Sequence, residues 1–510
     1  MNNPRLQLRP GHLSLSDLRK ANREPVSVSL NRETWQRIRA CRQVVDDVIA
    51  NGDVAYGINT GFGRLAQTTI DIGNLAKLQE NLLLSHAAGV GQPMQDRVIR
   101  LAMLLKLNSL ARGYSGVSCE VVELLAGMLN NRIYPVVPGK GSVGASGDLA
   151  PLAHLSLPLI GLGHVRVDDR IQDSVTALQQ VGLQPISLRA KDGLSLLNGT
   201  QISTALALSA LFDAEMNADA AFIAGSMTVE ATLGSRSPFD AGISEIRGLH
   251  GQIEAARIFR LILDVSELGH SHQACDRVQD PYSLRCQPQV MGACLDQLRH
   301  AAGILEIESN AVSDNPLVFP DRKVILSGGN FHAESVAMVS DNIALAVAEM
   351  AALSERRLAL LIDSHLSQLP PFLVADAGLN SGFMIAQVTA AALASENKSL
   401  AHPACVDSLP TSANQEDHVS MATFAARRLF DMNENSSYII GIELLAAAQG
   451  LDFRRPLRSS DTIESAHATI RSVVPTWDRD RLMHSDIEAA FRLIKDGAFD
   501  SSVSHYIDAR

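Results

Sequence analysis

A run of small residues from Gly141 to Gly147 carries the most distinctive chemistry that this sequence offers. Small residues allow a backbone to fold back on itself where a Cβ atom would clash. In Ala145-Ser146-Gly147 the amide nitrogen of Gly147 can therefore attack the carbonyl carbon of Ala145, and loss of water closes a five-membered ring. Loss of a second water from the Ser146 side chain leaves an exocyclic methylidene. The product, a methylidene-imidazolone, is an electrophile made from the chain itself.

Taken alone, the tripeptide favours an ordinary glycine-rich turn, because Ala-Ser-Gly arises by chance in long chains. The longer run from Gly141 to His154, however, resembles the prosthetic-group segment of the histidine/phenylalanine ammonia-lyase family. The loop from Tyr56 to Gly63 is similar to a loop of that family almost letter for letter. Six segments between Tyr56 and Glu416 carry the resemblance in the same order and spacing. The sequence is therefore identified as a member of this family, over nearly its whole length.

The resemblance implies elimination of ammonia from the α carbon of an aromatic amino acid while a proton leaves the β carbon. An amine is a poor leaving group, and the electrophile from residues 145–147 would capture it. The resemblance makes Tyr56 the base, although the ordinary tyrosine pKa of about 10 must then be brought toward the working pH. It also makes Arg285 the partner of the substrate carboxylate, a role that suits a planar and permanently charged guanidinium.

Further pocket residues follow from the same resemblance. Asn198 and Tyr282 match residues next to the prosthetic group, where they would bind its carbonyl and orient or protonate the leaving amine. Gln279 and Phe331 match other positions in the pocket. For each polar residue taken singly, the alternative is a hydrogen bond that stabilises a loop.

The identity of the substrate depends on two positions that resemble those of the histidine-type lyases, His86 and Glu416. Imidazole needs polar partners for its two ring nitrogens. Tyrosine-type lyases also have a histidine near the first position, so Glu416 has more weight. A carboxylate facing a phenyl ring would be buried without a partner, which is costly. We therefore expect L-histidine as the substrate, with trans-urocanate and ammonia as products.

Three alternatives remain open at this point. A tyrosine ammonia-lyase or an aromatic aminomutase would use the same electrophile. A non-catalytic helical scaffold would lack Ser146, Tyr56 or Arg285, all of which are present. The fumarase and argininosuccinate-lyase group would need a Gly-Ser-Ser-x-Met-Pro type loop, which this sequence does not have. We expect no metal site, because His270-x-His272 is the only close histidine pair, and no external cofactor.

The composition limits the partners and the compartment. The formal net charge is −11 and is spread along the chain, which argues against binding of nucleic acid. Six scattered cysteines fit a reducing compartment, and the N-terminal residues lack the apolar stretch of a signal peptide. The most apolar helical run, residues 343–362, contains four charged residues, which argues against a membrane span. A cytoplasmic protein is expected.

The fold is expected to be mainly α. Long helices rich in alanine and leucine pack as a bundle, and we expect a smaller N-terminal lobe, residues 1–200, to carry the prosthetic-group loop. Residues 201–510 would form the central bundle and the C-terminal helices, with a soft boundary or one continuous domain. Several helices are apolar on more than one face, which favours burial between subunits, and the resemblance implies a homotetramer with active sites assembled from more than one subunit.

The periodicity also predicts individual elements. Residues 5–15 are expected to form a hairpin, and Asn31 is expected to cap a helix that ends near Gly52. A short strand pair is expected within residues 164–187 and another between residues 313 and 332. Further helices are expected at residues 75–88, 97–131, 205–233, 249–265, 289–310, 333–362, 382–398 and 416–449, and two amphipathic helices in the last sixty residues.

Overall fold

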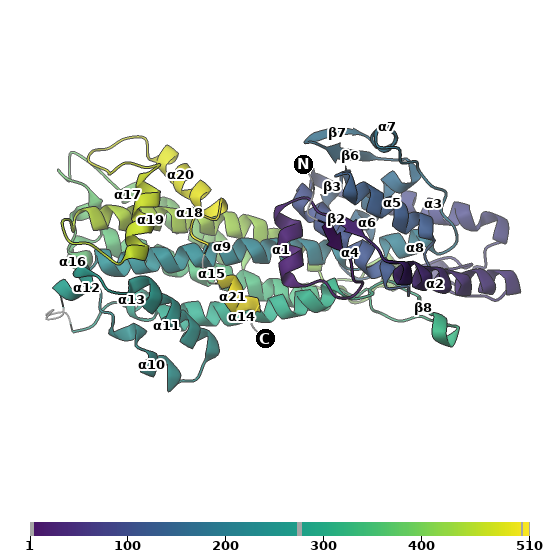
Figure 1. Ribbon diagram of the computed structural model, residues 1–510, viewed down its shortest axis with the longest axis horizontal. Coiled ribbons are helices and arrows are strands. Elements are labelled where there is room, and N and C mark those ends of the chain that lie inside the picture. Colours follow the sequence, from purple (N-terminus) through teal and green to yellow (C-terminus); the bar gives the residue numbers. More distant parts are fainter. Residues whose placement is uncertain (1–4, 273–277, 501–502, 509–510) are drawn as a thin grey trace. The chain divides into compact units, whose positions relative to one another are not determined.

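The computed structural model describes residues 5–272, 278–500 and 503–508 (Figure 1). Most of the described residues are helical, so the prediction of a mainly α protein is confirmed. The chain divides into two compact units. Unit 1 comprises the chain up to Ser209 together with Gly303–Asp341 and Pro403–Arg427, and unit 2 comprises Ala210–Ala302, Asn342–His402 and the chain from Arg428. The boundary predicted near residue 200 stays a prediction.

The helices of the first two hundred residues are α1 (Leu15–Arg23), α2 (Arg32–Asn51), α3 (Leu75–His86), α4 (Asp96–Ala111), α5 (Cys119–Asn130), α6 (Leu149–Ser156), α7 (Ser174–Gln180) and α8 (Asp192–Leu197). The later helices are α9 (Gln201–Ala231), α10 (Ala241–Glu245), α11 (His250–Leu263), α12 (Glu267–Ser271), α13 (Tyr282–Arg285), α14 (Gln287–Ser309), α15 (Glu334–Ile362), α16 (Ser364–Ser367), α17 (Met384–Leu400), α18 (Ala422–Asp452), α19 (Asp461–Arg471), α20 (Met483–Lys495) and α21 (Val503–Asp508). Most of the predicted helices therefore exist close to their predicted bounds.

The strands of the described residues are short and belong to unit 1. β3 (Val90–Pro93) pairs antiparallel with β5 (Pro138–Lys140), and β8 (Leu317–Phe319) pairs antiparallel with β9 (Val324–Leu326). The three-stranded sheet consists of β4 (Tyr134–Pro135), β6 (His164–Val167) and β7 (Arg170–Asp173). The strand pairs predicted within 164–187 and between 313 and 332 are thus confirmed.

The hairpin predicted for residues 5–15 is wrong. β1 (Arg5–Gln7) instead pairs in parallel with β2 (Ser27–Ser29). The expected turn exists, since the His12 amide donates to the Arg9 carbonyl at 3.0 Å. It leads into α1, where Ser14 accepts from the Asp17 amide and the Ser14 amide donates to Asp17. This capping box starts a helix at the place where the second strand of a hairpin would run.

The first long helix, α2, ends where the sequence predicts. The Asn31 side chain accepts from the Thr34 amide at 2.8 Å, which satisfies one of the free amides of the first turn. Gly52 ends the helix with a φ of 75°, in the left-handed region that glycine adopts without strain. Cys41 and Val45 on the buried face of α2 pack against Ile58 in the core of unit 1.

Four long helices contribute most of their length to unit 2: α9, α14, α15 and α18 (Figure 1). Among the described helices, α15 alone is long and apolar enough to cross a membrane, but 67% of its most apolar window is buried within the protein. It contributes Arg357 to the interior, where the guanidinium pairs with Glu443 of α18. Such burial is typical of a core helix.

Helix α18 begins at Ala422, six residues later than predicted. Residues 412–414 and Met421 all have positive φ values, which a helix cannot include. The Thr411 amide donates to the Glu416 carbonyl at 2.8 Å and closes a tight loop. Glu416 therefore lies on a loop and not in a helix. The cysteines of the described residues are free, and Cys275 lies outside those residues.

Candidate active site

The predicted prosthetic-group loop lies between β5 and α6 in unit 1 and meets a second stretch of backbone at Gly147. Gly147 pairs with Gly199, and the Asp148 amide donates to the Gly199 carbonyl at 2.7 Å. A Cβ atom on Gly147 would lie 2.3 Å from the Gly199 oxygen, and the φ of Gly147 is 77°. Glycine alone meets both constraints. The residue whose amide would close the ring is thus held where no side chain fits.

Ser146 is bound both at its side chain and at its carbonyl. Its hydroxyl donates to Glu416 Oε1 at 2.6 Å, and its carbonyl accepts from Asn198 Nδ2 at 2.6 Å. Asn198 is 4% exposed, and its Oδ1 is buried without a hydrogen-bond partner among the residues that the structure describes. A buried acceptor of this kind is uncommon. It can therefore accept from a group bound beside the tripeptide.

The carboxylate of Asp148 holds the base of the loop. It is fully buried and accepts from the Ser203 amide at 2.7 Å, the Thr423 hydroxyl at 2.8 Å and the Ser142 hydroxyl at 3.1 Å. Burial raises the pKa of Asp148, and the hydrogen bonds from Ser203, Thr423 and Ser142 oppose that rise. The loop is thereby tied to the start of α9 and to the start of α18.

Two later segments are attached to the same loop through Gly144. The Ala333 amide donates to the Gly144 carbonyl at 3.2 Å, and the Ser420 hydroxyl donates to the same oxygen at 2.9 Å. Phe331, which is half-buried, lies two residues before Ala333, and Glu416 lies four residues before Ser420. Two of the predicted pocket residues are therefore on segments fixed to the prosthetic-group loop.

The carboxylate of Glu416 is surrounded by donors. Oε1 accepts from Ser146, and Oε2 accepts from the hydroxyls of Thr411 at 2.6 Å and Ser412 at 3.0 Å. Burial raises the pKa of Glu416, but the hydrogen bonds from these three hydroxyls and the proximity of His86 outweigh that effect, so the pKa lies below its usual value. Glu416 is thus a carboxylate at neutral pH and can accept further donors.

His86 ends helix α3 and acts electrostatically on Glu416. Its Nδ1 lies 2.9 Å from the Leu82 carbonyl, which can only accept, so Nδ1 carries the proton. Burial lowers the pKa of His86 and outweighs the opposing effects of the Leu82 carbonyl and Glu416. A neutral His86 therefore keeps a lone pair on Nε2. This nitrogen can accept a hydrogen bond, as the Glu416 carboxylate can.

Tyr56 also belongs to unit 1 but is not joined to this group. It lies in the loop after α2, where the Gly63 amide lies 3.4 Å from its hydroxyl oxygen. No hydrogen bond between Tyr56 and the tripeptide occurs within residues 5–272, 278–500 and 503–508. Its role as the base stays a prediction.

The other three predicted residues belong to unit 2. Tyr282 and Arg285 lie on α13, a single helical turn that precedes α14. The Arg285 guanidinium lies 4.5 Å from the centre of the Tyr282 ring, and its Nε donates to the Asp280 carbonyl at 3.0 Å. Tyr282 is 70% exposed, and Gln279 is exposed. These three residues are therefore not among the residues that unit 1 brings together around Ser146.

Comparison with known proteins places this geometry in a family. The family model described as aromatic amino acid lyase matches residues 13–472. The chain belongs to the aromatic amino acid lyase family. A histidine ammonia-lyase of Vibrio cholerae is 61% identical over 491 residues, which cover 96% of both chains.

Solved structures agree with this membership. The crystal structure of a histidine ammonia-lyase from Trypanosoma cruzi is similar with a TM-score of 0.90 and 41% identity, over 98% of this chain and 95% of that one. A tyrosine aminomutase from Streptomyces globisporus is similar with a TM-score of 0.92 and 34% identity over the whole of both chains. The helical fold of this lyase is therefore that of its family.

The structure adds one residue to the site of this lyase that sequence reasoning missed, Lys106. Its side chain is 1% exposed in the middle of α4, and Nζ donates to the carbonyls of Asn198 at 2.9 Å and Ser195 at 3.2 Å. Burial lowers the pKa of Lys106 to about 7, although nearby Asp314 and Asp148 oppose this effect. Lys106 thus holds the backbone of the residue that binds Ser146.

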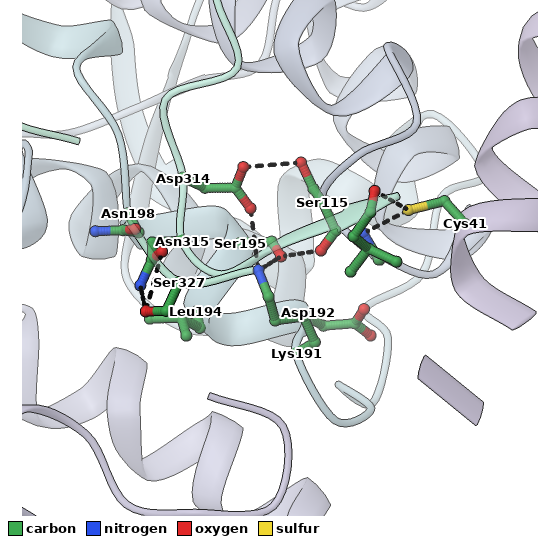
Figure 2. A network of polar contacts seen from close by, with 12 residues as sticks. Cys41, Ser115, Lys191, Asp192, Leu194, Ser195, Asn198, Asp314, Asn315 and Ser327 are labelled. Atoms are coloured by element: carbon green, nitrogen blue, oxygen red, sulfur yellow. Dashed lines mark hydrogen bonds and ion pairs between the residues drawn. The ribbon is translucent and has the colours of Figure 1, made fainter. Parts of the chain in front are cut away.

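A second buried lysine of the lyase is paired, unlike Lys106 (Figure 2). Lys191 Nζ donates to Asp314 Oδ2 and to the Ser195 hydroxyl, both at 3.0 Å. The Ser195 hydroxyl in turn donates to the Ser115 carbonyl at 2.9 Å. Residues 98–111 are all buried. A lysine within this mostly apolar stretch is the sequence feature by which Lys106 could have been found, because lysine is rarely buried.

Proposed function

We propose that this lyase is a histidine ammonia-lyase, which eliminates ammonia from L-histidine to give trans-urocanate in the first step of histidine degradation. The observation that carries the proposal is the Glu416 carboxylate 2.6 Å from Ser146, with His86 acting on it. The histidine ammonia-lyase of Vibrio cholerae, at 61% identity, supports the same substrate.

The proposal includes a methylidene-imidazolone formed from Ala145, Ser146 and Gly147 without an external cofactor. The residues fit this group, because a side chain on Gly147 would collide with Gly199 and because Asn198 offers a buried, unpartnered oxygen beside Ser146. When formed, the group supplies an electrophile that makes the substrate amine a better leaving group.

Loss of the Ser146 hydroxyl in this reaction also prepares the substrate pocket. That hydroxyl is the donor to Glu416 Oε1, and it departs as the second water molecule. Oε1 then lacks its donor, while Thr411 and Ser412 still hold Oε2. A carboxylate oxygen is thereby freed for the N–H of an imidazole, whereas a phenyl ring would leave it unpaired.

The remaining roles concern the rest of the substrate. Tyr56 removes the β proton, and Arg285 binds the carboxylate as a planar cation. Asn198 and Tyr282 orient the amine, and Tyr282 protonates it as it leaves. The pocket is completed by Gln279 and Phe331.

The assembly and the compartment complete the proposal. The protein is a homotetramer with active sites built from more than one subunit, and it is cytoplasmic. The exposure of Tyr282 and Gln279, two pocket residues that unit 1 does not assemble, supports sites completed by assembly. The predominantly buried α15 supports a protein that stays outside the membrane.

A second candidate is a tyrosine ammonia-lyase or aromatic aminomutase that uses the same electrophile. It is favoured by the similarity to the tyrosine aminomutase of Streptomyces globisporus, at 34% identity and a TM-score of 0.92. The carboxylate of Glu416 argues against an unsubstituted aromatic substrate, because a phenyl ring would leave the carboxylate without a partner.

The experiment that separates the two candidates is near-ultraviolet absorbance after mixing the purified protein with L-histidine, L-tyrosine or L-phenylalanine, without added cofactor. We expect the absorbance of a conjugated acrylate to grow with L-histidine only. Growth with L-tyrosine would overturn the assignment of Glu416 while keeping the electrophile. No growth with any of the three would contradict the lyase proposal.

A further inference from the structure

Three potential metal ligands lie together in unit 1, on segments next to those of Phe331 and Glu416. His332, Glu334 and His418 each offer one ligand atom, and these atoms lie within 4.8 Å of one another. Two imidazoles and a carboxylate form a donor set that zinc commonly takes in proteins, with further positions filled by water or a ligand.

The carboxylate of Glu334 has one oxygen atom that is free to bind a cation. Its Oε2 is buried and has no hydrogen-bond partner among the described residues. A buried carboxylate oxygen without a donor loses the hydration that it would have in water. A cation held by the same three side chains would restore that lost interaction. Because Glu334 is the first residue of α15, its backbone is fixed by a long helix.

The ring of His332 makes a hydrogen bond of the kind that histidine ligands of metals make. Its Nε2 lies 3.2 Å from the His418 carbonyl, which can only accept, so Nε2 carries the proton. The other ring nitrogen, Nδ1, then holds the lone pair. Histidine ligands in proteins almost always donate their second ring N–H to a carbonyl, a carboxylate or water, which fixes the tautomer. The His418 ring lies 5.6 Å away, measured between ring centres.

We propose that His332, Glu334 and His418 bind one divalent ion of the zinc class per chain. Magnesium and calcium prefer oxygen ligands and are disfavoured by the two imidazoles. The ion would link the segment after Phe331 with the segment after Glu416. It would thereby hold two walls of the proposed pocket to each other without touching the substrate.

The sequence pattern predicts no such site, for a physical reason. His332 and His418 are 86 positions apart, and no helix carries two of the ligands at a zincin-like spacing. The two ligand segments come together because Ala333 and Ser420 both donate to the Gly144 carbonyl. The site is therefore a product of the fold around the prosthetic-group loop.

The test is a calorimetric titration of the untagged, chelator-treated full-length protein with zinc chloride, in the absence of substrate. We expect one ion per chain with a Kd of about 1 µM or tighter and no binding of magnesium chloride under the same conditions. Glu334→Gln and His418→Ala are each expected to weaken binding by at least about tenfold. The matched control His365→Ala removes an exposed histidine of α16 and is expected to bind zinc like the wild type.

Each variant is first checked by circular dichroism, and Glu334→Gln keeps the shape of the side chain in case His418→Ala does not fold. A Kd weaker than about 1 µM, wild-type affinity in Glu334→Gln, or an equal loss in His365→Ala would overturn the proposal. Zinc is also expected to slow amide hydrogen exchange in residues 327–333 and 408–421, and unchanged exchange would refute the link between these segments. Because no substrate is present, the result is independent of the lyase activity.

Discussion

Two clusters of buried charge, one in each unit, are satisfied in different ways. In unit 2, Arg357 and Glu443 are fully buried and form two contacts of 2.5 and 2.7 Å. Thr228 and Ser354 donate to the same carboxylate, and Gln287 accepts from the guanidinium. These side chains come from four long helices, and they surround the ion pair with hydrogen bonds.

In unit 1, the buried charges next to Ser146 instead hold backbone, although Lys191 and Asp314 pair with each other in the same unit. Lys106 Nζ donates to the carbonyls of Asn198 and Ser195, and Asp148 accepts from the Ser203 amide. These contacts fix the segments that surround Ser146. The difference indicates that the unit 2 cluster stabilises a bundle, whereas the unit 1 cluster sets the shape of the site. Substitutions in the two clusters should therefore separate stability from activity.

The largest effect on activity is expected in unit 1 for Ser146→Ala. The methylidene carbon comes from the Ser146 side chain, so turnover of L-histidine should fall on the order of a thousandfold or more. The midpoint of urea unfolding should change little, because the change is confined to one small residue on a loop. Steady-state absorbance assays and urea titrations measure the two quantities. Full activity in this variant would show that the Ser146 side chain does not supply the electrophile, and the contrast between the two clusters would lose its chemical basis.

The largest effect on stability is expected in unit 2 for Glu443→Gln. The substitution leaves the Arg357 charge buried without a counter-charge, which should lower the free energy of unfolding by about 3–5 kcal/mol. Lys77→Ala is the matched control, because it breaks a solvent-exposed pair with Glu80 and should cost less than about 1 kcal/mol. Equal effects in the two variants would show that burial does not distinguish the unit 2 cluster.

Glu416→Gln should separate the effect of unit 1 on substrate turnover from its effect on stability. We expect kcat/KM for L-histidine to fall about a hundredfold, since the amide has lost the charge that attracts the imidazole N–H. Stability should change by less than about 1 kcal/mol, because Glu416 is only half-buried on a loop. Kinetics with L-histidine, alongside thermal unfolding, test this. Unchanged kinetics would mean that Glu416 does not contact the substrate.

The last effect concerns the pH dependence of stability that Lys106 imposes. Its pKa is about 7 in the folded protein against 10.5 ordinarily, so the unfolded chain binds the extra proton between these values. Stability must therefore rise with pH in that window, and the cost of burying the ammonium is full below pH 7. We expect the stability of the wild type relative to Lys106→Met to increase between pH 7 and 9.5, as measured by urea unfolding. A constant difference would contradict the lowered pKa.

Local chemistry made part of the fold predictable. Asn31 and Gly52 mark the ends of α2 because each satisfies a backbone requirement that depends only on neighbouring residues. The small residues around Ser146 likewise meet a local steric requirement, because a side chain on Gly147 would collide with neighbouring backbone. Elements of this kind, including the long helices, could be inferred from the sequence alone.

Features that depend on distant segments could not be inferred in the same way. The β1–β2 pairing joins residues on either side of α1, and the loop around Glu416 replaces a predicted helical turn. Lys106 lies on a mostly apolar helix, and the sequence around it does not show what its charge contacts. Its two carbonyl partners lie about ninety residues later in the chain. Only the folded chain brings these groups together.

The most direct test of the central claim, that the electrophile is made from the backbone of unit 1, is the intact mass of the purified protein. We expect the wild type to be lighter than the mass of its sequence by two water molecules, and Ser146→Ala to lack the loss that comes from the serine side chain. A wild-type mass equal to that of the unmodified sequence, in protein that converts L-histidine, would contradict the account.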